Sequence, residues 1–503
     1  METRRLPPIE TMSSYPARRS SLPKCCMNRR HFVTAGTLGL SNLGLSWLLK
    51  QEGYAAQIGL EKPALEPAIY DLSPKEPPRE ATAKSMISLF MGGGPSHIDL
   101  FDPKPLLERF HGKLLPNEFD VKHDNGGQAS KTVMASPYRF SSHGESGIQL
   151  SELLPHTADI VDDITLIRSM NLGGIRNHLA GMQAMNFGRA NANRPSLGSW
   201  LTYGLGSETQ ELPTFVAIMV DKPPGPPQWV SNGMLPSIYQ GTFVRNERPR
   251  LLNLDPPEHL SSDDQARQLQ LLERLDQRHA NHHPQEFDLQ ARISTYELAA
   301  RMQTSANEAF DLSMETAETQ ALYGVNDNLC RPLAEACLIA RRLVERGVRF
   351  VQIWYYDWDM HERIYDSLPK VCRISDRPSA ALVKDLKRRG LLDQTLVHWG
   401  GEMGRLPVIQ DRGEGMATAG RDHNTDGFSM WLAGGGVRAG HVHGSTDEFG
   451  LKAVTDVVHH YDYLATVLHM FGLNAEELVY KQNTRNESIL DGQPGKVIDK
   501  LLA

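Results

Sequence analysis

The sequence predicts an α/β fold in which a mainly parallel, doubly wound sheet lies between helices. The first observation is a series of near-continuous apolar runs at 85–91, 164–170, 213–220, 348–354, 395–399 and 428–432. Such runs are typical of strands that are buried on both faces of a sheet. The second observation is an amphipathic helical pattern at 333–345, which ends at Arg346-Gly347, and a similar pattern at 379–389. Helices that alternate with apolar strands favour a parallel sheet.

The N-terminal 56 residues are predicted to be an export signal rather than part of the fold. Arg29-Arg30 is a twin-arginine pair that precedes a weakly apolar run at 33–49 and a small-x-small cleavage site at Gly53-Tyr54-Ala55. The apolar run is too short and too rich in glycine for a stable membrane span. Twin-arginine signals direct the export of folded proteins, so we expect a periplasmic or other extracytoplasmic location. The alternative is a chance arginine pair before an anchor helix.

The rest of the chain divides into an arm and one large domain. Residues 57–83 contain a stretch rich in Pro, Glu and Lys, which predicts a linker or a surface arm, and the folded domain is expected over 84–503. Within it, 256–321 is charged and rich in His and Gln, with leucines at helical spacing, so we expect a helical insert there. Further helices are predicted at 150–161, 179–187 and 462–471.

The overall composition excludes some classes of partner. A formal net charge of -7 over 503 residues gives no reason to expect a nucleic-acid or anionic-membrane partner. Cys330, Cys337 and Cys372 are too widely spaced for a zinc knuckle or a disulfide framework. The chain has 19 His residues, an excess that favours metal or acid–base chemistry, although surface histidines would explain it equally well.

Three groups of Asp and His residues lie in loops that should follow strands of the sheet. In an open α/β sheet, the loops beyond the carboxyl ends of the strands meet at one crevice. Carboxylate and imidazole ligands together suit zinc or manganese, whereas carboxylates alone suit magnesium or calcium. Two such groups could hold two cations about 4 Å apart and clamp the oxygens of a phosphoryl or sulfuryl displacement. Any one of these residues could instead form a turn. The groups are His97, Asp99 and Asp102; Asp357, Asp359 and His361; and Asp422 and His423.

Three further residues are candidates for catalysis. Glu402 and Arg405 lie in the segment Gly-Glu-Met-Gly-Arg, where glycine allows a ligand to approach the backbone. The arginine could hold an anionic oxygen, but an ordinary Glu–Arg surface pair is an equal alternative. His178 opens a predicted helix and could be a general base, a donor to an anion or a capping residue.

The motifs together resemble the domain of unknown function 1501 family, which is abundant in planctomycete-like bacterial genomes. The resemblance covers nearly the whole chain from Arg29. It is carried by the twin-arginine leader, 92–99 with 101–105, 195–200, 340–350, 358–361, 400–405, 420–423 and 445–450. That family is grouped with the alkaline-phosphatase-like superfamily of phosphatases, sulfatases and phosphomutases. The resemblance therefore implies an alkaline-phosphatase-like fold with metals at the carboxyl edge of the sheet.

The resemblance also implies roles for particular residues. One metal would be held by Asp99 or Asp102 with Asp422 and His423, and a second by Asp359 or Asp357 with His361. The superfamily's Ser, Thr or modified Cys nucleophile opens a helix after the first strand. The matching helix here would begin at Asn177-His178-Leu179, which has no hydroxyl or thiol.

The sequence thus predicts an exported metal-dependent hydrolase of a phosphate or sulfate ester that lacks the usual nucleophile. Water activated by a metal or by His178 could substitute for it. We expect one or two divalent ions (zinc, manganese, magnesium or calcium) and a small-molecule or polysaccharide ester as substrate. Two alternatives remain: a non-catalytic exported binding protein on the same scaffold, or Asp/His groups that are structural and hold one calcium.

Overall fold

We describe the protein from a computed structural model. The structure describes residues 71–503, apart from 122–129, 192, 221–227, 253–260, 283–286, 411–414 and 483. The predicted export signal at 1–56 and the first part of the arm at 57–83 therefore lie outside the described residues. Within the described ranges, no helix is both long enough and apolar enough to cross a membrane.

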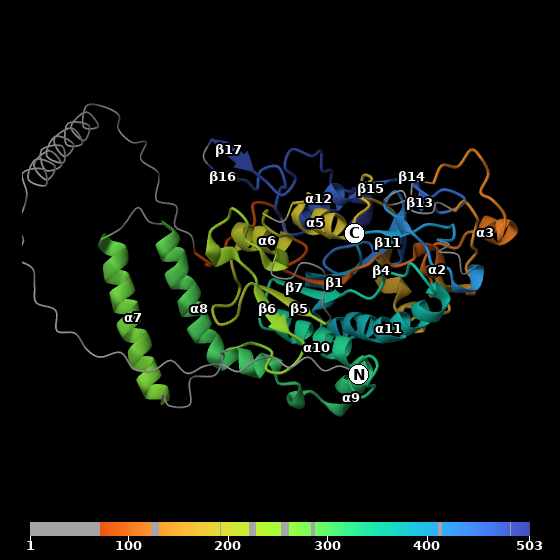
Figure 1. Ribbon diagram of the computed structural model, residues 1–503. Helices are drawn as coiled ribbons and strands as arrows, with labels where there is room; N and C mark the ends of the chain where they lie inside the picture. The colour runs from red at the N-terminus through yellow and green to blue at the C-terminus, as the bar shows by residue number, and fades with distance from the viewer. Residues whose placement is uncertain are drawn as a thin grey trace, which may run out of the picture. The chain divides into compact units, whose positions relative to one another are not determined.

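A nine-stranded sheet forms the centre of the described chain (Figure 1), in the order β12-β4-β11-β8-β1-β7-β5-β6 with β15 beside β4. Among these strands only β11 runs antiparallel to its neighbours. The sheet is therefore mixed and mainly parallel, which confirms the predicted fold class. The strands are β1 (Ser85–Met91), β4 (Ile164–Asn171), β5 (Phe215–Met219), β6 (Thr242–Arg245), β7 (Phe350–Tyr355), β8 (Thr395–Gly400), β11 (Phe428–Ala433), β12 (His441–His443) and β15 (Val458–His459).

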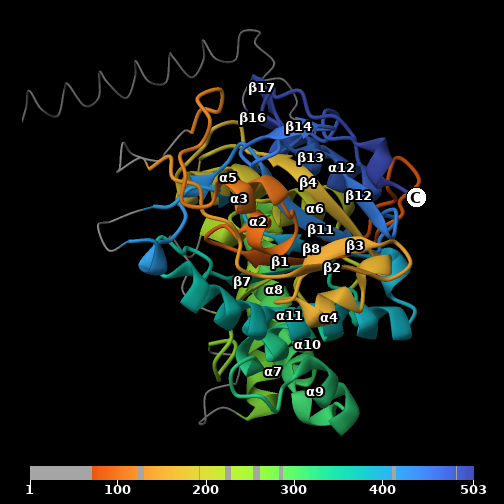
Figure 2. The same ribbon diagram turned by 90° about the vertical axis from the view of Figure 1, so that its right-hand side faces the viewer.

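Helices cover both faces of the sheet, which explains why its central strands are apolar throughout. Ile87, Leu89 and Met91 of β1 belong to the core shared with α10 (Arg331–Glu345) and α11 (Ile364–Arg388). Met86 and Phe90 belong to the core on the opposite face. Figures 1 and 2 show the two helical layers on either side of β1. The helices of the second layer are α5 (His178–Phe187), α6 (Leu197–Leu205) and α12 (His460–Met470).

Two predicted helices differ from the observed ones. The helix expected at 379–389 is the second half of α11, which begins at Ile364 and continues through Pro369 and Pro378. Proline removes a helical hydrogen bond and usually marks a helix end. The two prolines therefore argued against a helix in the first half of α11, and none was predicted there. The helix expected at 150–161 is wrong: its residues form the end of strand β3 (Ile148–Ser151) and two short helical turns, because β3 pairs with β2 (Phe140–His143) in a hairpin.

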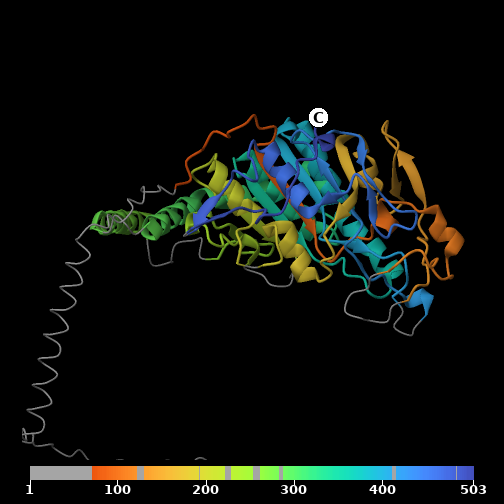
Figure 3. The same cartoon turned by 90° about the horizontal axis from the view of Figure 1, so that it is seen from above.

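The predicted insert at 256–321 contains α7 (Ser262–His282), α8 (Phe287–Phe310) and most of α9 (Ala317–Tyr323). Helices α7 and α8 lie side by side, to one side of the sheet in Figures 1 and 3. The remaining elements are α2 (His97–Leu100), α3 (Pro105–Phe110), β2 (Phe140–His143), β3 (Ile148–Ser151), α4 (Pro155–Ala158), β9 (Gly404–Arg405), β10 (His423–Asn424), β13 (Ser445–Thr446), β14 (Ala453–Thr455), β16 (Tyr480–Gln482) and β17 (Arg485–Glu487).

Candidate metal centre

The carboxyl edge of the sheet brings four loops together. Asp359 and His361 follow β7, Glu402 and Arg405 follow β8, and His178 begins the helix after β4. His423 reaches the same edge by a different route from the one its sequence suggests. It precedes β11 rather than following a parallel strand, and β11 is antiparallel, so its N-terminal end lies beside the carboxyl ends of its neighbours.

Four of these side chains converge on one point. His178, Asp359, His361 and His423 each contribute one nitrogen or oxygen, and these four atoms all lie within 4.8 Å of one another. Asp359 Oδ1 is 3.0 Å from His178 Nε2, 2.8 Å from His361 Nε2 and 3.6 Å from His423 Nε2. The Asp359 side chain is 30% exposed, so the cluster is open to solvent on one side.

The far nitrogen of each imidazole ring faces an oxygen acceptor. His178 Nδ1 is 2.6 Å from a carboxylate oxygen of Glu402, and His423 Nδ1 is 2.8 Å from the carbonyl oxygen of Arg176. His361 Nδ1 faces the side-chain oxygen of Gln410. An acceptor at Nδ1 fixes the hydrogen on that atom and leaves the lone pair on Nε2. All three rings are therefore set to direct an Nε2 lone pair at the same point.

This arrangement fits a bound cation. The Nε2 atoms of His361 and His423 are only 2.9 Å apart, and two lone pairs at that distance repel unless a proton or a cation lies between them. The Nε2 atom of His178 is buried without a well-aligned hydrogen bond among the described residues. Ligand nitrogens around a tetrahedral zinc ion are about 3.3 Å apart, so a small outward shift would accommodate the ion.

The electrostatics of the cluster also favour a positive charge. Burial alone lowers the pKa of His178, but its interactions with Asp359 and Glu402 outweigh burial and raise the pKa to about 9. Burial raises the pKa of Asp359, yet hydrogen bonds from the three histidines, when their Nε2 atoms carry protons, hold that pKa far below its usual range. A bound metal ion would take the place of those protons. The two carboxylates therefore favour a cation between them, and a bound metal ion would supply that charge.

Arg405 and Glu402 support the cluster from beneath it, and both are fully buried. Arg405 lies 2.7 Å from Asp359 Oδ1 and donates to the carbonyl oxygens of Gly94 and Arg421. Glu402 accepts from the backbone N–H of Gly93 at 3.0 Å as well as from His178. Neither residue belongs to a surface pair, so that alternative is wrong, and both tie the loop after β1 to the cluster.

The loop after β1 fits this site only because of its glycine. Gly93 has a φ of 103°, which L side chains rarely adopt, and a Cβ atom there would lie 2.6 Å from the backbone nitrogen of Asp359. The glycine thus allows the first loop to pack directly against the segment that carries Asp359 and His361.

The first predicted group, in the loop after β1, lies outside the cluster. Both oxygens of Asp99 accept from Arg421, at 2.8 and 3.2 Å, and neither side chain is exposed. Asp102 pairs with Lys104 at 3.0 Å, and His97 Nε2 lies 2.9 Å from the carbonyl oxygen of Gly450. These side chains are engaged with protein partners.

Asp422 and Asp357 also lie outside the four-residue cluster. A carboxylate oxygen of Asp422 accepts the backbone N–H of His423 at 2.8 Å. Asp357 lines a pocket of about 460 Å³ that also includes Asp359 and His361. The same pocket contains Ser367 and Lys370 of α11. Neither residue was predicted to belong to a site, because no helix was expected before residue 379.

The fold and the cluster define a class: an α/β protein with a His₃Asp candidate metal centre at the carboxyl edge of a mainly parallel sheet. The family model described as "Protein of unknown function (DUF1501)" matches residues 83–502. Because the match covers most of the chain, this protein belongs to the DUF1501 family. No curated protein matches the sequence.

Several solved structures are similar at low identity. They include the PsFucS1 sulfatase from Pseudoalteromonas sp., with 12% identity over 78% of this chain and 68% of that chain, and a TM-score of 0.34. A protein of the alkaline phosphatase superfamily from Vibrio parahaemolyticus has 9% identity over 89% of this chain and 76% of that chain, with a TM-score of 0.35. Likenesses of this extent carry no argument about chemistry, which comes from the site itself.

Proposed function

We propose that this protein is an exported metal-dependent hydrolase that acts on a phosphate or sulfate ester. The observation that carries the proposal is the orientation of three imidazole rings. Each of His178, His361 and His423 has its Nδ1 held by an oxygen acceptor and its Nε2 near one oxygen of Asp359. Such acceptors are typical of metal-ligating histidines, because they fix the tautomer and raise the basicity of the ligand.

The ligand set favours one ion of zinc or manganese. Three imidazole nitrogens and one carboxylate suit these metals better than magnesium or calcium, which prefer oxygen ligands. In the part of the chain that the structure describes, this is the one group of three or more His, Cys, Asp or Glu side chains whose ligand atoms lie close enough together to hold an ion. When bound there, the ion supplies Lewis acidity toward an ester oxygen and toward water.

The chain's own residues supply the remaining functions. Glu402 fixes the orientation of His178, and Arg405 holds Asp359 in place while it adds a positive charge beside the centre. In the adjoining pocket, the exposed Lys370 can bind an anionic ester oxygen. Asp357, exposed in the same pocket, is our candidate for the acceptor of the proton from the attacking water.

Helix α5 follows β4, whereas the helix after the first strand is α2, whose N-cap Ser96 is buried and donates to Asp99. Water is the attacking group in this proposal because Ser96 is engaged in this way and the start of α5 has no hydroxyl or thiol. The N-cap there is Asn177, whose side chain accepts from the backbone of Ala180. Attack by water on phosphorus or sulfur breaks the bond to the ester oxygen and releases an alcohol. No covalent intermediate with the protein is needed.

The test combines metal analysis with a panel of chromogenic esters. The purified full chain is analysed for metal content and then assayed on p-nitrophenyl phosphate, bis-p-nitrophenyl phosphate and p-nitrophenyl sulfate. We expect about one zinc or manganese ion per chain and turnover of at least one ester. His361→Ala should abolish both, whereas His441→Ala, a histidine outside the cluster, should change neither.

The outcomes separate the alternatives. A chain without a stoichiometric transition metal contradicts the metal centre. A stoichiometric metal with no turnover of any ester would favour the non-catalytic binding protein on the same scaffold. Export rests on Arg29-Arg30 and the run that follows. It is tested by changing both arginines to lysine, which should retain the protein in the cytoplasm.

A further inference from the structure

A second pocket, of about 520 Å³, opens at the same edge of the sheet as the candidate metal centre. Its floor is the loop after β4, with Leu172, Gly173 and Ile175. Strand β15 pairs in parallel with β4 and places His459 beside Asn171, so the start of α12 forms a wall. Asn191, after α5, and Gln493, near the C-terminus, complete the lining.

The pocket and the metal centre share one loop. Leu172, Gly173 and Ile175 line the pocket, and the next residue, Arg176, offers its carbonyl oxygen to His423 Nδ1 at 2.8 Å. His178, two residues further on, belongs to the cluster. None of the residues that line the pocket is a candidate metal ligand. A ligand in this pocket would therefore lie on the far side of a short loop from the centre.

The charged groups of the pocket form ion pairs with one another. Asp491 contacts Arg189 at 2.8 Å, Arg194 at 3.3 Å and Arg485 at 2.6 Å. Arg194 and Arg485 also contact Glu487. This network holds its planar polar side chains in place, and three arginines against two carboxylates leave one net positive charge.

Three polar atoms of the lining residues lack hydrogen-bond partners among the described residues: Arg194 Nε, His459 Nδ1 and His460 Nδ1. Two of them, on Arg194 and His460, differ in kind. Arg194 is 7% exposed and His460 is 3% exposed, and Arg194 Nε and His460 Nδ1 are both buried without a hydrogen bond. Arg194 Nε can only donate. His460 Nε2 faces the carbonyl oxygen of Gly188 at 3.2 Å and so carries the hydrogen, which leaves Nδ1 as an acceptor.

An aromatic surface lies beside these polar groups. The rings of His459 and Tyr461 stack with centroids 4.9 Å apart and an interplanar angle of 16°. Both rings line the pocket and are half-buried. Stacked rings offer a flat apolar face next to hydrogen-bonding groups, a combination that suits a ligand with C–H groups on one side and hydroxyl groups on the other.

We propose that this pocket binds a neutral sugar unit of a carbohydrate whose phosphate or sulfate ester lies at the metal centre. A hydroxyl group both donates and accepts, so neighbouring sugar hydroxyls can satisfy Arg194 Nε and His460 Nδ1 after small side-chain adjustments. The unprotonated oxygens of a phosphate or sulfate only accept, and they would leave His460 Nδ1 unpaired. The link to an ester rests on the proposed function, whereas binding of the sugar does not. The substrate class is thereby an esterified oligo- or polysaccharide.

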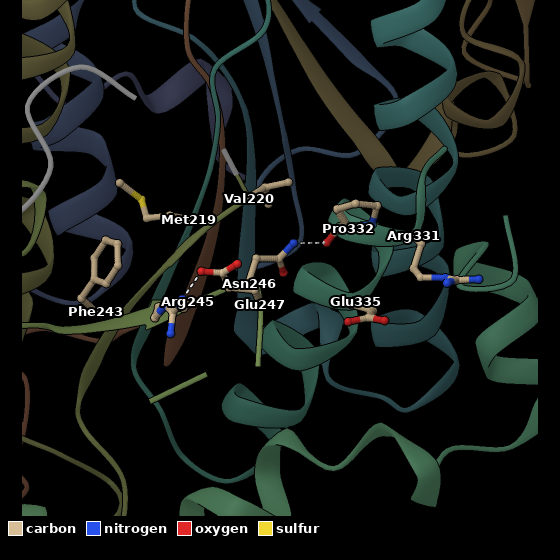
Figure 4. A pocket seen from close by; sticks show the side chains of 9 residues that line it. All are labelled: Met219, Val220, Phe243, Arg245, Asn246, Glu247, Arg331, Pro332 and Glu335. Carbon is tan, nitrogen blue, oxygen red and sulfur yellow. Dashed lines mark hydrogen bonds and ion pairs between the residues drawn. The ribbon is translucent and has the colours of Figure 1, made fainter. Parts of the chain in front are cut away.

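A different pocket offers a matched control. It has a volume of about 560 Å³ and lies at the ends of β5 and β6 (Figure 4). Phe243 and Met219 are on one side of it and Arg331 and Glu335 on the other. Phe243 is an exposed aromatic side chain, 38% accessible, in a pocket of similar size but without the stacked rings. Phe243→Ala therefore removes an aromatic wall from a pocket that should not bind sugar.

The test is saturation-transfer NMR on the full chain with glucose, galactose, mannose and fucose, and with inorganic phosphate and sulfate as competitors. We expect transfer to at least one sugar, and Tyr461→Ala should weaken its binding about tenfold through the lost aromatic contact. Asn191→Ala, at an exposed position that should not affect folding, should also weaken binding. Phe243→Ala should leave it unchanged.

The proposal is overturned if no sugar binds, if the Tyr461 and Asn191 variants bind as the parent does, or if phosphate or sulfate displaces the sugar. Metal content and ester hydrolysis, which test the proposed function, are measured separately from sugar binding. His361→Ala should lose the metal and yet retain sugar binding, because no pocket residue is in the cluster. A chain that binds sugar but hydrolyses no ester would keep this inference and contradict the proposed function.

Discussion

Two carboxylates at the same edge of the sheet, Asp359 and Asp99, have opposite surroundings. Asp359 is partly exposed and lies among three imidazole rings. Asp99 is wholly buried, and both of its carboxylate oxygens accept hydrogen bonds from the guanidinium group of Arg421, which is also buried. They follow the neighbouring strands β7 and β1. Position at the carboxyl edge therefore does not by itself make a carboxylate a metal ligand.

The difference lies in which cation each carboxylate meets. Arg421 brings a permanent positive charge to Asp99, so that pair needs no ion from solution. Around Asp359 the rings can each present a lone pair, while Arg405 reaches one of its oxygens from below. One edge of the sheet thus holds a protein cation at one position and, in our proposal, a metal ion at another.

The largest expected effect is at Asp359. Asp359→Ala removes the carboxylate around which the three Nε2 atoms gather, and we expect the bound metal to fall from about one ion per chain to almost none. Elemental analysis of the folded variant measures this directly. Asp357→Ala, which changes an exposed aspartate of the adjoining pocket, should retain the metal. Equal metal content in the two variants would contradict the ligand assignment.

Asp99 should affect stability rather than metal content. Asp99→Ala leaves Arg421 buried without its partner, and breaking a buried pair in this way costs about 3–5 kcal/mol of unfolding free energy. Urea denaturation measures the loss. The double variant Asp99→Ala, Arg421→Met should recover much of it, because an apolar replacement of the whole pair leaves no buried charge. If Asp99→Ala removed the metal from folded protein, the contrast with Asp359 would be lost.

Glu402 should have an intermediate effect on metal affinity. Glu402→Gln keeps an acceptor for His178 and for the N–H of Gly93 but removes the negative charge that makes the ring a better ligand. We expect metal affinity to fall about 10- to 100-fold, measured by competition with a chromogenic chelator. Glu362→Gln, at an exposed glutamate of the adjoining pocket, provides the control and should bind metal as tightly as the parent.

The sequence was sufficient for the sheet and for part of the site. The apolar runs of β1, β7 and β8 predicted buried parallel strands, and Asp359 and His361 were selected because they follow one of them. Asp99 looked equivalent in sequence, because its partner Arg421 is 322 residues away and only the folded chain brings them together.

Other features depended on distant contacts in the same way. The role of His178 depends on Glu402, 224 residues later, so its ring could have been a base, a donor or a cap. The approach of His423 to the site depends on β11 being antiparallel, which no local pattern reveals. Such features arise from pairing between remote segments, whereas strands and helices arise largely from neighbouring residues.

The smallest expected effect, at Gln410, tests the same idea in the opposite direction. His361 has a neutral amide oxygen at Nδ1 where His178 has a carboxylate. Gln410→Glu should therefore make His361 a stronger ligand and raise metal affinity, on the order of threefold. The gain is small because residue 410 is only half-buried, so solvent would screen the charge that the substitution adds. Gln410→Leu, which removes the acceptor, should lower affinity. Opposite shifts in these two variants would show that the oxygen behind each ring, and not the ring alone, sets how strongly this centre binds its ion.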